Sequence, residues 1–192
     1  MPAELRRRVT TEIVFETHAI STDNEAGIAT GWLEGQLSEE GRRLARRLGE
    51  RRRGEWIDTV YTSDLGRAIE TAELAFGDSG IPIRLDARLR ECNYGSLNGG
   101  PVFEAERQRI KRIDEPFPGG ESYHEVVERT RAFLADLVER HDGERVLVIA
   151  HSANRWALEY LLHGTPLEDQ VDAPFDWRPG WVYTVTRQAV RP

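Results

Sequence analysis

Short apolar segments rich in β-branched and aromatic residues recur along the chain, and longer segments with helical spacing of apolar residues separate them. The short segments have the length and composition of β-strands, and they span residues 11–16, 56–61, 81–85, 145–150 and 181–186. The segment 145–150 (R-V-L-V-I-A) is apolar almost throughout, which is typical of a parallel strand buried on both faces.

The helical segments lie between these strands. Their apolar spacing predicts helices at residues 38–53, 63–77, 122–138 and 152–162, and a short charged helix at 102–113. Ser38, either Ser63 or Asp64, and Ser122 are the expected N-caps, and Ser122 with Glu125 has the spacing of a capping box.

Strands that alternate with helices form βαβ units, which build a parallel sheet covered by helices on both faces. We therefore expect an α/β fold, a three-layer sandwich with a mostly parallel central sheet. The length of 192 residues suits a single domain, 1–192. The segment 93–120, loop-like at both ends, is expected to form a cap or lid.

Composition and charge exclude several classes of function. The 33 acidic and 26 basic side chains give a net charge of -7, so nucleic acid is not an expected partner. A single cysteine, Cys92, excludes an intrachain disulfide and a multi-thiolate zinc site, and the five histidines form no H-E-x-x-H pattern, so no metal or other cofactor is expected. The apolar run Ile13–Phe15 is too short for a signal peptide or a membrane span, so we expect a cytoplasmic protein without a membrane partner.

Residues suited to phosphoryl transfer follow the predicted strands. His18 and His151 each come directly after a strand, Arg67 stands early in the helix 63–77, and Glu91 lies in the loop 89–99. The carboxyl ends of parallel strands share one edge of a sheet, where ligands bind. A neutral imidazole can attack phosphorus, an arginine can hold the phosphate oxygens, and a carboxylic acid can protonate the leaving oxygen, all without a metal. Backbone N–H groups at the start of the helix at Ser152 would favour the same anion.

Four segments containing these residues resemble a known family. They read T-H-A-I-S-T-D-N followed by G-W-L-E-G-Q-L-S-E-E-G, Y-T-S-D-L-G-R-A-I-E-T-A, L-R-E-C-N-Y-G-S-L-N-G, and V-L-V-I-A-H-S. In this order they resemble the histidine phosphatase superfamily, also called phosphoglycerate mutase-like, from Ile13 to about Leu162. The resemblance implies that His18 is the nucleophile that forms a phosphohistidine and that Glu91 is the general acid and then the base. It also implies that His151 stabilises the transferring group.

The same resemblance implies a phosphate-binding set and a small phosphorylated substrate. The expected phosphate-binding residues are Arg67, Asn24, Ser21, Thr17, Ser152 and Arg155. The sequence leaves the identity of the substrate open. It also leaves the oligomeric state open, a homodimer included.

One departure from the family pattern concerns the residues around His18. The family motif is R-H-G, and here it is Thr17-His18-Ala19, so one arginine of the phosphate pocket is missing. Loss of a charge-assisted clamp could slow the chemistry on the order of hundreds-fold. Arg155 is our candidate substitute because it follows His151 by about one helical turn, and Arg90 is a second.

Three functions remain open on these grounds. The favoured one is a metal-independent phosphomonoester hydrolase. The alternative is a degenerate member that binds a phosphorylated ligand or a protein partner without turnover, and a phosphoglycerate mutase is a third, disfavoured by the short chain. Because His18 must be neutral to attack, we expect the rate to depend on pH near neutrality.

The remaining histidines and aromatics are assigned to packing or to the cleft. We expect His124, His141 and His163 to be surface or capping residues and Cys92 to be a small packing residue. Four aromatic residues are expected either to form walls of the substrate cleft or to pack in the core or loops: Trp32, Tyr94, Phe103 and Phe117.

Overall fold

A five-stranded sheet forms the centre of the part of the chain described by the computed structural model, which is residues 10–174 and 178–189. The strands are β1 (Thr10–Thr17), β2 (Thr59–Thr62), β3 (Ile83–Leu85), β4 (Arg145–Ala150) and β5 (Trp181–Thr186). Their order across the sheet is β3-β2-β4-β1-β5. The pairs β3–β2, β2–β4 and β4–β1 are parallel, and β5 runs antiparallel to β1. The mostly parallel sheet is therefore confirmed.

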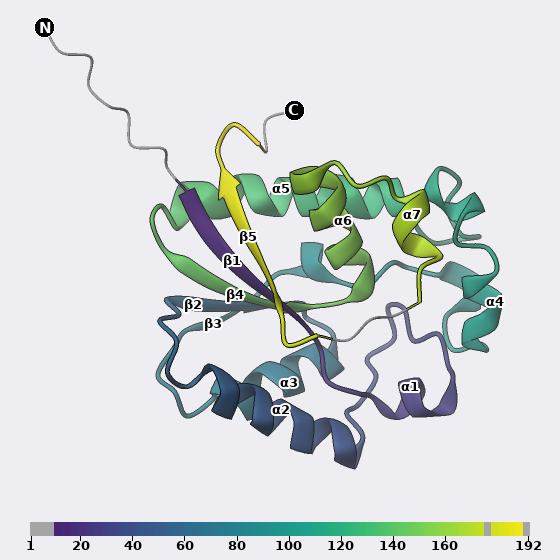
Figure 1. Cartoon of the computed structure of the whole chain (residues 1–192). Coiled ribbons are helices and arrows are strands. Elements are labelled where there is room, and N and C mark those ends of the chain that lie inside the picture. The colour runs from purple at the N-terminus through teal and green to yellow at the C-terminus, as the bar shows by residue number, and fades with distance from the viewer. Residues whose placement is uncertain (1–9, 175–177, 190–192) are drawn as a thin grey trace, which may run out of the picture.

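Helices cover both faces of this sheet (Figure 1). One face is covered by α2 (Glu39–Arg52) and α3 (Gly66–Phe76), and the other by α5 (Tyr123–Arg140) and α6 (Ser152–His163). The short helices are α1 (Thr22–Ala26), α4 (Val102–Glu106) and α7 (Glu168–Val171), with single 3₁₀ turns η1 (Ala87–Leu89), η2 (Gly95–Leu97) and η3 (Lys111–Ile113). This arrangement confirms the expected three-layer α/β sandwich. Among the described residues, no helix has both the length and the apolar character that crossing a membrane requires.

The two layers of core follow from the alternation of side chains along the strands. In β1, Ile13 and Phe15 pack in one cluster with apolar residues of α5, whereas Val14 packs in another with Leu48 of α2 and Phe76 of α3. β4 contributes to both clusters and is buried on both faces, as its uninterrupted apolar sequence predicts.

Several predicted boundaries of helices and strands were wrong. The strand expected at 56–61 begins only at Thr59, since Trp56 lies outside the sheet, 79% exposed, and its indole N–H donates to Asp58. The helix expected from Ser63 or Asp64 begins at Gly66, and its N-cap is Leu65 without a side-chain cap. The expected helix 102–113 is two short turns, α4 and η3. The helices α1 and α7 were not predicted.

The segment 93–120 packs through a small core of its own. The rings of Tyr94, Phe117, Tyr123 and Trp156 contact one another in sequence, edge to face, with centroids 5.2–6.1 Å apart, and so join the segment to α5 and α6. Phe117 is 1% exposed within this core, which agrees with the core-packing alternative, and Phe103 is 57% exposed. The function of this segment as a cap stays a prediction.

Candidate active site

Two histidines from distant parts of the sequence meet at one edge of the sheet. β1 and β4 are parallel neighbours whose last residues, Thr17 and Ala150, pair in register. His18 and His151 directly follow these two residues, and their ring centroids are 5.0 Å apart. The sheet topology alone therefore produces the pair that the sequence predicted.

The hydrogen bonds of His18 define its reactive atom. Its Nδ1 lies 2.7 Å from the carbonyl oxygen of Ala19. A carbonyl only accepts, so Nδ1 carries the proton and Nε2 keeps its lone pair. Burial and then the positive charge of Arg67 lower the pKa of His18 to about 3. His18 is therefore neutral near pH 7. Its protonation changes at a pH far below neutrality, so His18 itself does not supply the pH dependence near neutrality that the sequence predicted.

His151 is held in the opposite tautomer by Ser63. Its Nε2 is 2.8 Å from the Ser63 hydroxyl, and its Nδ1 is 3.4 Å from Nη2 of Arg67. An arginine only donates, so Nδ1 accepts and Nε2–H donates to Ser63. Burial, with the charge of Arg67 as the next cause, holds the pKa of His151 well below its usual value. Ser63 was predicted only as a helix cap; its position directly after β2 is the signal that places it beside the histidines.

Arg67 joins both histidines to the loop at residues 31–34. Its side chain is 2% exposed, and its Nε lies 3.3 Å from Nε2 of His18. Nη1 donates to the carbonyls of Leu33 (2.9 Å) and Glu34 (3.4 Å), and Nη2 donates to that of Gly31 (2.9 Å). With the contact to His151, each of the five N–H groups of the guanidinium has a protein acceptor. A bound phosphate oxygen must therefore replace one of the long contacts.

Glu91 is a buried carboxyl group near this arginine. It is 9% exposed, and its Oε1 accepts a hydrogen bond from the Cys92 amide at 2.7 Å. Burial raises the pKa of Glu91, and the charges of Arg67 and Arg129 oppose that increase. A carboxyl group that keeps its proton to higher pH is suited to general-acid catalysis.

A model of the histidine phosphatase superfamily (branch 1) matches residues 13–186 of this chain. The chain belongs to this superfamily. It is 34% identical over 151 residues to the phosphoglycerate mutase-like protein 4 of Arabidopsis thaliana, and the match covers 73% of this chain and 66% of that protein. The chain thus spans about two thirds of the length of that relative.

Solved structures of similar proteins have the same fold as this histidine phosphatase superfamily member. Bacillus stearothermophilus YhfR is 31% identical with a TM-score of 0.79, over 91% of this chain and 90% of that one. The mycobacterial glucosyl-3-phosphoglycerate phosphatase Rv2419c is 26% identical with a TM-score of 0.72, over 84% of each chain.

The other predicted phosphate-binding residues of this superfamily member lie in different elements. Ser21 and Asn24 hydrogen-bond each other in the capping box of α1, where Asn24 Oδ1 accepts from both the amide and the hydroxyl of Ser21. Thr17 ends β1 and Ser152 begins α6, so both adjoin a histidine of the pair. Their contact with phosphate stays a prediction.

The two candidate substitutes for the missing arginine have other partners in this superfamily member. The guanidinium of Arg155 lies over the ring of Trp181, 5.2 Å from its centroid. Arg90 donates two hydrogen bonds to Asp64, at 2.7 and 2.6 Å, and lies 4.7 Å from the ring centroid of Trp32. Contact of either guanidinium with a bound phosphate stays a prediction.

The other histidines of this superfamily member lie outside the site. His124 and His163 are exposed and pair with Asp114 and Glu159. His141 is the C-cap of α5, which confirms the capping alternative; it is 7% exposed and lies between the Tyr61 hydroxyl and Glu144. Cys92 is buried, as expected.

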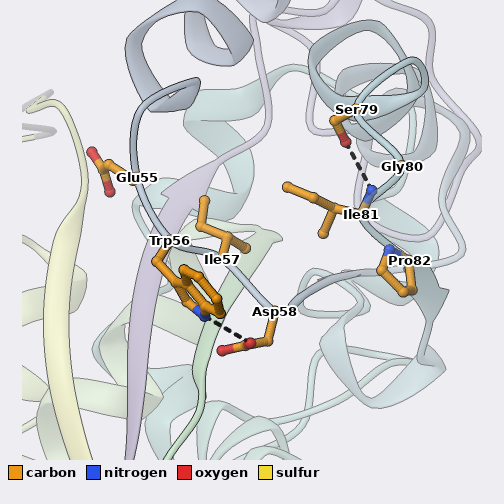
Figure 2. Close-up of a pocket in the computed structure, with 8 residues that line it drawn as sticks. All are labelled: Glu55, Trp56, Ile57, Asp58, Ser79, Gly80, Ile81 and Pro82. Atoms are coloured by element: carbon orange, nitrogen blue, oxygen red, sulfur yellow. Dashed lines mark hydrogen bonds between the residues drawn. The ribbon is translucent and has the colours of Figure 1, made fainter.

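A cavity of about 390 Å³ lies at the opposite end of the sheet (Figure 2). Residues 55–58 and 79–82 line it, and these segments precede β2 and β3, whereas the histidine pair follows β1 and β4. Across the part of the chain that the structure describes, no three His, Cys, Asp or Glu side chains cluster as metal ligands would. The histidine pair with Arg67 and Glu91 therefore remains the candidate active site of this histidine phosphatase superfamily member.

Proposed function

We propose that this protein is a phosphomonoester hydrolase that acts through a phosphohistidine on His18, with Glu91 as general acid and base. The observation that carries the proposal is the state of the His18 ring. Its Nδ1–H is fixed on the Ala19 carbonyl, and its neutral Nε2 faces the buried guanidinium of Arg67. An imidazole in this state has a lone pair for nucleophilic attack beside a cation that attracts a phosphate.

The proposed reaction has two steps. In the first, the Nε2 lone pair of His18 forms a bond to phosphorus, the ester P–O bond breaks, and the proton of Glu91 passes to the leaving oxygen. In the second, a water molecule attacks phosphorus, Glu91 takes its proton, and the P–N bond breaks to release inorganic phosphate. Neither step needs a redox change or a further reactant.

Arg67 and His151 would stabilise the phosphoryl group during both steps. Arg67 supplies the positive charge at the site. For His151 to donate to a phosphate oxygen, its Nδ1 must take up a proton, and the negative charge of the substrate favours that uptake. Its Nε2–H remains fixed by Ser63, so the ring keeps its orientation in either state.

The similar solved structures support phosphatase chemistry in general terms. One of them is a glucosyl-3-phosphoglycerate phosphatase, a name that describes that protein. The phosphate-ester class of substrate is therefore our proposal for this chain, and the alcohol part of the substrate stays open.

Trapping the phosphoenzyme tests this proposal. The parent protein should hydrolyse 4-nitrophenyl phosphate, His18→Gln should not, and Glu91→Gln should accumulate a phosphorylated protein that is labile to acid and stable to base. The exposed His163→Gln is the matched control and should retain parent activity. Hydrolysis by His18→Gln at the parent rate would refute the proposal.

A second function has one specific observation in its favour. Position 17 is threonine, so the cation of the R-H-G pattern is missing, and the loss of a contact that strengthens in the transition state disfavours turnover more than binding. In that case the parent protein would not hydrolyse aryl phosphates, and inorganic phosphate would still raise its Tm. A mutase would instead isomerise a phosphoglycerate and release little phosphate.

A further inference from the structure

Arg129 of α5 binds the backbone that carries Glu91. Its Nη1 donates to the carbonyl oxygens of Arg88 and Arg90, both at 2.7 Å, and its Nη2 donates to the carbonyl oxygen of Glu91 at 3.0 Å. The side chain is only 15% exposed. One guanidinium therefore binds three backbone carbonyls. Two precede the proposed general acid in the chain, and the third belongs to Glu91 itself.

Glu121 links Arg129 to the backbone on the carboxyl-terminal side of Glu91. Its carboxylate accepts from Nε and Nη2 of Arg129, at 2.9 and 3.1 Å, and its Oε2 also accepts from the amide of Asn93 at 2.9 Å. The Arg129–Glu121 pair thus contacts the chain before and after Glu91. Arg129 of α5 holds the beginning of the segment 88–93. Glu121, which precedes the N-cap of α5, holds its end at Asn93.

The segment 88–93 is also held by Arg90, which donates two hydrogen bonds to Asp64, and by the Asn93 carbonyl, which accepts from the amide of Glu121 at 2.9 Å. It lies between η1, which ends at Leu89, and η2, which begins at Gly95, so no helix or strand includes Glu91. A second donor to the Glu91 carbonyl is the indole N–H of Trp32, at 2.8 Å. Trp32 belongs to the loop that Arg67 binds through Gly31 and Leu33. The backbone of Glu91 is therefore tied both to α5 and to the phosphate-binding arginine.

We propose that Arg129 is a positioning residue, which holds the backbone of Glu91 so that its carboxyl group can protonate the leaving oxygen. Arg129 itself does not touch substrate in this proposal, which rests on the proposed function. A lysine at this position would keep the positive charge, but its single ammonium could not replace a planar fork that contacts three carbonyls and a carboxylate.

The leaving group distinguishes positioning of an acid from a general effect on the fold. Dinitrophenolate leaves without a proton, whereas phenolate needs one, so a displaced Glu91 should impair cleavage of phenyl phosphate selectively. We expect Arg129→Met and Arg129→Lys to lower kcat/KM for phenyl phosphate by about 100-fold, because small misplacements of a catalytic group have effects of that size. The value for 2,4-dinitrophenyl phosphate should fall by less than about threefold. Both rates come from one preparation, so their ratio does not depend on the fraction of folded protein.

Two further variants make the outcome decisive. Arg131→Met removes a guanidinium from the same helix that pairs with Glu128, and it should leave the ratio at the parent value. Glu91→Gln should reproduce the selective loss. If Glu91→Gln is selective and both Arg129 variants lower the two rates equally, the positioning role is refuted while the proposed function stands. If Glu91→Gln lowers both rates equally, the acid role of Glu91 is refuted, and the inference fails with it.

A pH profile separates position from charge. The charge of Arg129 lowers the pKa of Glu91 against the effect of burial, so Arg129→Met should move the loss of kcat/KM for phenyl phosphate to higher pH. Arg129→Lys should lower the rate without that displacement. A rate restored to the parent value by Arg129→Lys would show that charge alone matters and would overturn the proposal.

Discussion

Threonine at position 17 gives the phosphate pocket one cation fewer than the R-H-G pattern does. The side chain of Thr17 follows Ile13 and Phe15 on the face of β1 that packs against α5, next to His18. Thr17→Arg should raise kcat/KM for 4-nitrophenyl phosphate by about 10- to 100-fold, because a charge-assisted bond to an equatorial oxygen strengthens in the transition state. Steady-state kinetics at constant ionic strength measures the change.

The control for this variant adds the same charge elsewhere. Thr184 is exposed on β5, in register with Glu12, so Thr184→Arg changes the net charge without reaching the histidine pair. It should leave kcat/KM unchanged. An equal increase in both variants would mean that long-range attraction of the substrate, not a clamp at position 17, causes the effect.

The sequence predicts the candidate catalytic histidines better than the residues that hold them in place. His18 and His151 are predictable because they follow apolar strands, and parallel pairing brings such positions together. Ser63 and Arg129 were missed as parts of the site, since their roles depend on which side-chain and backbone atoms lie within hydrogen-bond distance in the folded chain. The guanidinium of Arg155 lies over the ring of Trp181, and its contact with phosphate stays a prediction from its spacing to His151.

At the level of elements, adjacent glycines at 119 and 120 lie in a loop near Glu91, and only Gly120 allows a close approach of backbones. A Cβ on Gly120 would collide with the carbonyl oxygen of Asn93 and the amide of Gly95, whereas a Cβ on Gly119 would meet no atom. Gly119 has a φ of 71°, so Gly119→Ala should cost about 1 kcal/mol of stability through its backbone alone. Gly120→Ala should cost about 3 kcal/mol, since backbone atoms must move to admit the methyl group.

Activity should separate these neighbouring variants further. Gly120→Ala displaces the backbone next to Asn93, which Glu121 and Arg129 hold, so kcat/KM for phenyl phosphate should fall by about 10-fold or more. Gly119→Ala should retain parent activity in the folded protein. Urea unfolding and kinetics on the same samples provide both numbers, and equal activity in the two variants would contradict the close-packing argument.

Helices and strands were predicted correctly where several sequence features indicate the same structure. Boundaries that depend on one tertiary contact were not. α5 has both a capping box at Ser122 and a continuous apolar stripe, and β4 is apolar from Val146 to its end, so local preference and burial agree. The start of α3 was wrong because Ser63 and Asp64, which suit an N-cap, bind His151 and Arg90 instead. α1 is too short for periodicity to reveal it.

In the whole molecule, the edge of the parallel sheet holds half-buried His18 and buried His151 in their neutral form, and folding stability must then depend on pH. In the unfolded chain a histidine takes up a proton near its ordinary pKa of 6.5, while folded His18 stays neutral until about pH 3. Between these values the unfolded state binds more protons, so the free energy of unfolding falls as the pH falls. His151, whose pKa is also lowered, acts in the same direction, whereas the raised pKa of Glu91 acts in the opposite one.

Comparison of variants isolates the contribution of His18 from those opposing effects. Each such imidazole should remove about 1.4 kcal/mol of stability per pH unit below 6.5. Between pH 7.5 and 5.5, His18→Gln should therefore lose about 1.4 kcal/mol less than the parent in urea unfolding. His163→Gln, which removes an exposed imidazole, should lose as much as the parent.

Neutral His18 should also sustain phosphoenzyme formation down to about pH 5, since protonation of its Nε2 lies well below that range. An equal loss of stability in parent and His18→Gln would mean that His18 takes up its proton in the folded state near its ordinary pKa, and the neutral nucleophile would then have to be abandoned.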